Sequence, residues 1–393
     1  MRQGAPHRVG VSPPDGLFTA SGPGSVRDDE RKMSTKTARP PWHDRYVTLD
    51  GMRGIAALAV ALFHFNISQA PHGYVAVDFF FALSGFVLCA SYLPRWQEGM
   101  GTGQFMMKRL VRLYPLFLVG VLLTTTVGLV RLHTGGDTSL PLRTILISTG
   151  INAAMLPSPL TGTLFPLNVP AWSLFYELVA NLAMVVLLFR LPRVALVAVC
   201  LASAWLFAPA VLENGSGNIG AVWGEWPLAL ARTLYSFCAG MLIARLRQPA
   251  HRPATLAGLL CLVAIAVMLL ADPKWLAAAH YDLACTLVIS PLLVWLGSRV
   301  EPSRRLAPAA WFVGEVSFAL YAVHWALIEP MRYFKDDLQY DEVLMAFVFL
   351  GTCLAVAWFC VRWIDVPART LLSDMLRRRK QARVVGTDHP TDG

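Results

Sequence analysis

The segment LDGMRGIAALAVALFHF, residues 49–65, places an arginine and a histidine in a stretch that is otherwise almost entirely apolar. Arg53 and His64 are eleven residues apart, which returns them to within about 20° of the same face of a helix. They would lie about 16 Å apart along that face. A guanidinium can hold a phosphate and a neutral imidazole can act as a general base. The pair could therefore mark the two ends of one catalytic passage.

The further ionisable residues inside apolar runs include Asp78, Glu177, Arg232 and His324. Burying an ionisable group in a membrane costs about 2.5 kcal/mol or more, so each one is a candidate functional residue. The span directions derived below place all four, with His64, in the outer third of the membrane. Structural alternatives stay open, because Asp78 or Glu177 could form an ion pair with Arg232 and His324 could bond between helices.

Two further arginines stand at the edge of an apolar run, in the sequence KRLVRLYP. Arg109 and Arg112 have i, i+3 spacing, which puts them one turn apart on one helix face. Guanidinium groups suit phosphates, so the pair could bind a phosphate-rich ligand. The alternative is the ordinary excess of positive charge beside a membrane span.

The elements that must position these residues are membrane helices. The chain is 55% hydrophobic and 15% charged, and apolar runs of roughly 20 residues recur along it. We expect an all-α polytopic membrane protein. Its ten spans are predicted at about 48–67, 74–93, 113–130, 172–189, 194–212, 228–244, 254–271, 277–297, 310–330 and 343–364.

The distribution of positive charge predicts the topology. With ten spans and a cytoplasmic N-terminus, 27 of the 34 Lys and Arg residues fall on the cytoplasmic side. A crossing by Thr144–Leu156 would invert every later loop, so we expect this short apolar segment to be re-entrant or interfacial on the outer side. Both termini are then cytoplasmic, and the net charge of +9 reflects topology and does not indicate nucleic-acid binding.

The domain organisation follows from composition. Residues 1–45 are polar and rich in Gly and Pro, which predicts a disordered cytoplasmic segment, and Met33 within it offers an alternative start. Residues 46–370 form the membrane domain, and we expect 371–393 to be a basic disordered tail. All seven cysteines lie in apolar runs without a CxxC pair, so they predict buried packing residues, and no metal site is expected.

Several of the candidate residues named above lie in short motifs that follow one another along the chain. The chain resembles the acyltransferase 3 family of bacterial membrane O-acyltransferases over nearly all of residues 47–370. The family's Arg, ten residues, then His matches Arg53 and His64, and its FFxLSGF lies within Phe79–Phe86. Its RxxRxxP, WSLxxE and SYxLYxxH motifs are matched by residues 109–115, 172–177 and 317–324. Two departures are Phe318 in place of Tyr and Asp365 in place of Glu.

The resemblance implies transfer of an acyl group, usually acetyl, from cytoplasmic acyl-CoA to a carbohydrate hydroxyl at the outer face. Acyl-CoA would be a co-substrate, with no permanently bound cofactor. His64 would be the general base, oriented by Glu177 or Asp78. His324, Ser84 or Ser173 would donate to the oxyanion. The phosphates of CoA would be held by Arg53, Arg109 and Arg112, and further substrate-binding residues would be Trp172, Arg232 and Tyr321.

The expected location is the bacterial plasma membrane, with membrane lipids and a polysaccharide or lipid-linked sugar as partners and no nucleic acid. The branch that decorates exopolysaccharides is the nearest in sequence pattern. Other readings remain open: acylation of a small metabolite such as a macrolide, a transporter for a lipid-linked sugar, or a membrane scaffold. A covalent acyl-His64 intermediate is also compatible with these residues.

Overall fold

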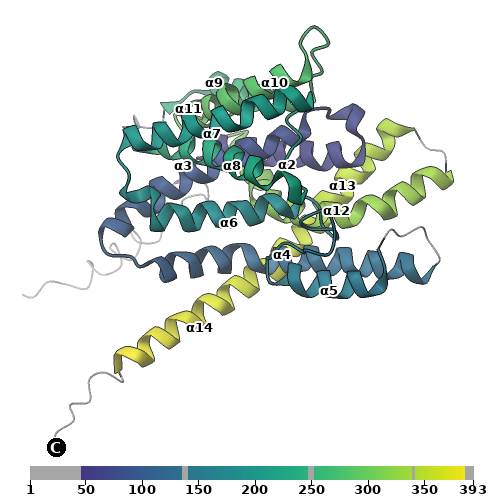
Figure 1. Cartoon of the computed structure of the whole chain (residues 1–393), viewed down its shortest axis with the longest axis horizontal. Coiled ribbons are helices and arrows are strands. Elements are labelled where there is room, and N and C mark those ends of the chain that lie inside the picture. Colours follow the sequence, from purple (N-terminus) through teal and green to yellow (C-terminus); the bar gives the residue numbers. More distant parts are fainter. Residues whose placement is uncertain (1–45, 135–139, 247–251, 339–340, 386–393) are drawn as a thin grey trace, which may run out of the picture. The chain divides into compact units, whose positions relative to one another are not determined.

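The molecule is built almost entirely of helices that pack side by side (Figure 1). This computed structural model describes residues 46–134, 140–246, 252–338 and 341–385. The helices are α2 (Val47–Phe65), α3 (Ala76–Gln97), α4 (Thr102–His133), α5 (Leu142–Ala153), α6 (Ala171–Val186), α7 (Arg193–Asn214), α8 (Trp226–Arg245), α9 (Thr255–Leu270), α10 (Ala278–Ala284), α11 (Ser290–Gly297), α12 (Ala307–Leu338), α13 (Glu342–Cys360) and α14 (Val366–Val385).

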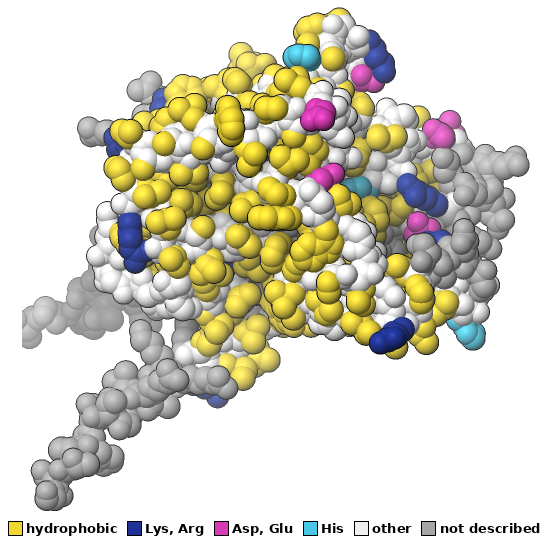
Figure 2. Space-filling view, in the orientation of Figure 1, with side chains coloured by type: hydrophobic (Ala, Val, Ile, Leu, Met, Phe, Trp, Pro, Cys, Tyr) yellow, Lys and Arg dark blue, Asp and Glu magenta, His cyan; other side chains and the backbone are white. Residues whose placement is uncertain are grey.

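The predicted all-α polytopic membrane fold is confirmed. Within the described residues, eight helical segments are long and apolar enough to cross a membrane, and α6 and α9 are shorter apolar helices at two further predicted positions. Hydrophobic side chains cover most of the visible face of this helical body (Figure 2). A short π-helical turn, Cys285–Ile289, joins α10 to α11, and another, Val361–Asp365, joins α13 to α14.

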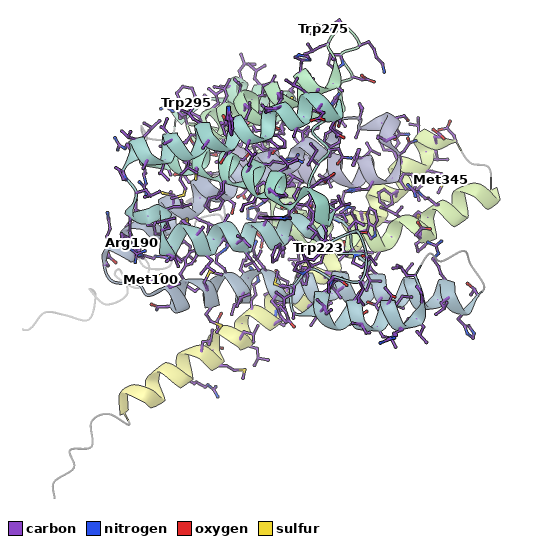
Figure 3. The ribbon with its side chains drawn as sticks, in the orientation of Figure 1. Met100, Arg190, Trp223, Trp275, Trp295 and Met345 are labelled. Atoms are coloured by element: carbon purple, nitrogen blue, oxygen red, sulfur yellow. The ribbon has the colours of Figure 1, made fainter. Side chains whose placement is uncertain are left out.

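The bundle has two ends, which we call basal and distal. At the basal end α2 begins and α13 ends, and a two-residue parallel pairing of β1 (Arg252–Pro253) with β2 (Val300–Glu301) closes it. Arg190 and Met100 lie toward the basal end, whereas Trp275 is at the tip of the α9–α10 connection at the distal end (Figure 3).

The short apolar segment near residue 150 forms a helix of its own, as expected. α5 runs back alongside the distal part of α4 (Figure 1). The connection over residues 154–170 then returns partway into the bundle, where Asn168 and Pro170 bond to Ala322 and Tyr321 of α12, before α6 begins at Ala171. This return sets the depth of every residue in α6.

Glycines allow the closest helix crossings. At the α3–α8 crossing, a Cβ atom on Gly85 would collide with the backbone oxygen of Phe237, and one on Gly240 with that of Ala82. At the α2–α12 crossing, a Cβ atom on Gly54 would lie 2.5 Å from the Val313 side chain. Small residues let the backbones of membrane helices approach closely, and this packing stabilises their association because the hydrophobic effect does not drive it within lipid.

The expectation of a disordered tail from residue 371 is wrong for residues 371–385, which continue α14. Leu and Arg, the commonest residues there, are good helix formers, and Arg369 pairs with Asp365 one turn earlier. Residues 1–45 and 386–393 lie outside the described residues. All seven cysteines are buried free thiols, as expected.

Candidate active site

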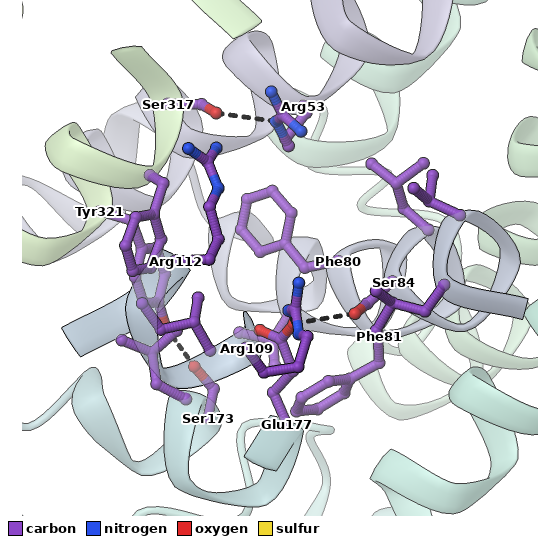
Figure 4. A pocket seen from close by; sticks show the side chains of 17 residues that line it. Arg53, Phe80, Phe81, Ser84, Arg109, Arg112, Ser173, Glu177, Ser317 and Tyr321 are labelled. Atoms are coloured by element: carbon purple, nitrogen blue, oxygen red, sulfur yellow. Dashed lines mark hydrogen bonds and ion pairs between the residues drawn. The ribbon is translucent and has the colours of Figure 1, made fainter. Parts of the chain in front are cut away.

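A cavity of about 170 Å³ lies among α2, α3, α4, α6 and α12 (Figure 4). Arg53, Arg109 and Arg112 line it together, although they come from two helices far apart in the chain. Phe80, Phe81 and several leucines supply an apolar wall. The cavity can therefore hold a ligand that has an anionic part and an apolar part.

Arg53 is fixed by α12. Its Nε donates to the hydroxyl of Ser317 at 2.9 Å and its Nη2 donates to the Gly314 carbonyl at 2.6 Å. Asp50, one turn earlier in α2, pairs with the same guanidinium at 3.0 Å. The prediction that Arg53 and His64 lie on the same face of α2 is thereby confirmed, because both contact α12.

Glu177 lies inside the cavity and is not placed beside His64. Its Oε1 accepts from Arg109 Nη2 and from the Ser84 hydroxyl, each at 2.8 Å. The predicted outer-third position is wrong, because the 154–170 connection lets α6 begin within the bundle and Glu177 then lies opposite Arg109, near the basal start of α4. The Nη2 of Arg109 and the Ser84 hydroxyl are therefore engaged by Glu177, so Ser84 is not a free oxyanion donor. Among the described residues the buried Nε of Arg109 has no hydrogen-bond partner, so Arg109 keeps donor capacity for a phosphate.

His64 and His324 meet at the distal end of the α2–α12 contact. Nδ1 of His64 lies 3.1 Å from Nε2 of His324, and the two rings stack at 25°. Nδ1 of His324 faces the carbonyl oxygens of Tyr321 at 2.9 Å and Leu320 at 3.2 Å. Trp325 packs edge-on against His64 at 5.2 Å between ring centroids.

These partners assign the hydrogens of both rings. A carbonyl oxygen only accepts, so Nδ1 of His324 carries the hydrogen and its Nε2 holds a lone pair. Nδ1 of His64 must then donate to that lone pair, which leaves Nε2 of His64 as its basic nitrogen. His324 therefore orients His64 and has no N–H left for an oxyanion, which corrects the role expected for it.

Tyr321 closes the distal end of the cavity. Its hydroxyl lies 2.7 Å from the Ser173 hydroxyl and 2.9 Å from the Pro170 carbonyl, and its ring packs against Phe80 (Figure 4). The ring centroid is 5.7 Å from that of His324, yet neither histidine lines the cavity. The expected open passage from Arg53 to His64 is therefore interrupted by one layer of aromatic side chains.

Asp78 and Arg232 form a buried ion pair away from the histidines. Arg232 is 1% exposed and makes two bonds to the Asp78 carboxylate, at 2.8 and 2.7 Å. Its remaining donors meet the carbonyls of Gly217, Ile219 and Tyr74. The structural ion pair left open by the sequence is thus the arrangement found. Asp78 does not orient His64 and Arg232 does not line the cavity, because every polar atom of this pair bonds to a neighbour within the core.

Other partners in the core were missed or misassigned from sequence. Trp172 lies under the Arg232 guanidinium, 5.8 Å from it, and is 8% exposed, so it packs and does not face the cavity. Thr286 donates to Asp78 at 3.0 Å. His72 and Tyr74 both bond to Asp282, a buried cluster that ties the connection between α2 and α3 to α10. The sequence signal that could have identified Thr286 and Asp282 was an isolated polar residue within an apolar run.

Comparisons with known proteins show the family of the chain. A family model described as an acyltransferase domain matches residues 46–362. "Protein 2 in picA locus" of Rhizobium radiobacter is 40% identical over 157 residues, which cover 36% of this chain and 81% of that protein. No solved structure matches.

Two further relatives carry functional names. Peptidoglycan O-acetyltransferase OatA of Listeria monocytogenes is 36% identical over 87 residues, or 21% of this chain and 13% of that protein. O-acetyltransferase OatA of Staphylococcus aureus is 33% identical over 82 residues, or 20% of this chain and 14% of that protein. The match thus spans a small part of these longer relatives, while the family model spans most of this chain. The chain belongs to the acyltransferase domain family.

Proposed function

We propose that this multi-pass membrane protein is an O-acyltransferase that moves an acetyl group from acetyl-CoA to a carbohydrate hydroxyl. The donor enters from the basal, cytoplasmic end and the acceptor approaches from the distal, outer end of a bacterial plasma membrane. The observation that carries the proposal is the cavity lined by three arginines, which ends one aromatic ring short of the oriented His64–His324 pair. The names of the acetyltransferase relatives support the acyl group and the class of acceptor.

The reaction uses the lone pair on Nε2 of His64. That nitrogen takes the proton of the acceptor hydroxyl as the hydroxyl oxygen attacks the thioester carbonyl. The carbon–sulfur bond then breaks, and the CoA thiolate receives the proton that His64 holds. His324 keeps the imidazole in the correct tautomer and orientation throughout, which is the part a carboxylate plays in a serine protease triad.

The cavity supplies the donor side of this reaction. Arg53 and Arg112 lie at its basal part, where they offset anionic charge on the donor, while Phe80 and Phe81 accommodate the apolar arm. Because Tyr321 separates the cavity from His324, the thioester reaches His64 only when the Tyr321 ring is displaced. Donor and acceptor would thus meet at the level of this residue.

Purified protein in lipid nanodiscs tests the proposal. We expect acetyl-CoA and a soluble glycan acceptor to yield free CoA thiol and acetylated glycan in equal amounts. His64→Ala should lower the rate by about 10²- to 10⁴-fold, the usual contribution of a general base. Transport of a lipid-linked sugar without CoA release, or full activity of His64→Ala, would refute this function.

A further inference from the structure

A second hollow lies at the basal end, between α4 and the helix α14. Its volume is about 470 Å³, and three cations line it: Lys108 and Arg112 from α4 and Arg369 from α14. Arg112 also lines the cavity of the candidate active site, so the two spaces adjoin at that residue. We call this hollow the α4–α14 groove.

The chemistry of the groove suits phosphate. Besides the three cations, the lining contains the hydroxyl groups of Thr370 and Ser373 and the carboxyl group of Asp374. The lining side chains therefore carry a net charge of +2 at neutral pH. Arg and Lys side chains next to hydroxyl groups are the usual ligands of phosphate oxygens in proteins.

Asp365 preorganises two of the cations. Its Oδ2 lies 2.6 Å from Arg369 Nη2 and 3.9 Å from Arg112 Nη1, and its side chain is 2% exposed. Within the described residues, the buried Nε of Arg369 has no hydrogen-bond partner. A buried donor left unpaired costs free energy, so a guanidinium in this state has donor capacity to spare for a ligand.

A ligand that reaches from the groove, at the basal end, to His64, at the distal end of the α2–α12 contact, must be long. Arg53, at the basal part of the cavity, is about 16 Å from His64 along α2. The nucleotide end of CoA carries three phosphates, and a flexible uncharged arm joins it to the thioester. We propose that the α4–α14 groove binds the phosphate-bearing nucleotide end of the acyl donor, while the arm passes Arg112 into the cavity. This assignment rests on the proposed function, and it places a binding residue, Arg369, beyond the segment that the family model matches.

Direct binding tests the groove without requiring acyl transfer. CoA is titrated into wild-type protein in nanodiscs of neutral phosphatidylcholine, and acetyl-pantetheine, which lacks the phosphates, serves as a second probe. We expect Lys108→Ala and Arg369→Ala each to weaken CoA binding about tenfold, the value of one charge-assisted hydrogen bond, and to leave acetyl-pantetheine binding unchanged. Arg378→Ala, on the same helix but outside the groove, is the matched control.

A further variant addresses folding. Arg369→Ala removes the partner of buried Asp365, so Ser373→Asp, which places a negative charge in the groove, is measured beside Ser373→Ala. We expect Ser373→Asp to weaken CoA binding about tenfold or more, and Ser373→Ala, which removes a hydroxyl without adding charge, to weaken it much less.

Two results would overturn the assignment. Wild-type CoA affinity in Lys108→Ala, Arg369→Ala and Ser373→Asp would show that the groove does not bind the donor. If these variants change binding to phosphatidylglycerol vesicles but not binding to CoA, the groove binds lipid headgroups and not the donor. If transfer is absent but CoA binding still depends on the groove, the proposed function fails and the groove stands.

Discussion

Replacing His324 with leucine tests the tautomer assignment of the histidine pair. Leucine removes the acceptor 3.1 Å from Nδ1 of His64, in a position where His324 is 0% exposed. A buried N–H without a partner costs about 1–3 kcal/mol, and the imidazole can escape that cost by rotating or by changing tautomer. Either response removes the basic Nε2 from the acceptor hydroxyl. At 1.36 kcal/mol per tenfold, kcat should fall about 5- to 150-fold.

The assay is the initial rate of CoA thiol release at saturating acceptor, over a range of acetyl-CoA concentrations. The KM for acetyl-CoA should stay unchanged because His324 does not line the cavity. His324→Gln is the matched variant, since its amide oxygen can still accept a hydrogen bond, and it should recover part of the lost kcat. If His324→Leu keeps the kcat of the wild type, or if only KM changes, His324 does not orient His64 and the reasoning is wrong.

Three other changes have definite expected outcomes. Tyr321→Phe removes the hydroxyl that bonds to Ser173 and to the Pro170 carbonyl, so hydrolysis of acetyl-CoA without acceptor should rise severalfold; an unchanged hydrolysis rate would show that these bonds do not hold the ring. Glu177→Gln removes the charge that Arg109 pairs with at 2.8 Å, so transfer should fall at least tenfold while the protein still inserts and purifies; normal transfer would exclude a role for Glu177. Burial of Glu301, with Asp50 nearby, raises the pKa of its carboxyl from 4.5 to about 7. Because this pKa is higher in the folded state, the wild type should lose stability as the pH rises from 4.5 to 7. Glu301→Gln should therefore have a higher melting temperature than the wild type at pH 8 and a similar one at pH 4.5, and equal melting curves at both pH values would contradict this shift.

The helices could be predicted from the sequence because crossing a membrane imposes a length. Each apolar run of sufficient length became a helix near its expected bounds, and the segment around residue 150, too short to cross, became α5. The alignment of Arg53 with His64 could also be predicted, since both lie on one uninterrupted helix. Helical periodicity fixes such relations within a single element.

The partners of the buried charges could not be predicted in the same way. Run length gives the depth of a residue in a membrane, but it does not say which helices are neighbours. An ion pair of Asp78 with Arg232 was one of the alternatives open from the sequence, and it is the packing of α3 on α8 that selects it over a contact with His64. Glu177 was misplaced even in depth, because nothing in its own helix shows that the preceding connection turns back into the bundle.

The aromatic layer at Tyr321 and Phe80 has a consequence for the energy supply of the cell. The bacterial plasma membrane, which we propose as the location of this protein, maintains a proton gradient, and a continuous row of water or hydrogen-bonding groups through a protein would discharge it. The packed rings of Phe80 and Tyr321 interrupt such a row between the arginine-lined cavity and the histidine pair. A thioester arm that displaces the ring and fills the same space would keep the barrier closed, so chemistry could proceed from one face of the membrane to the other without a leak.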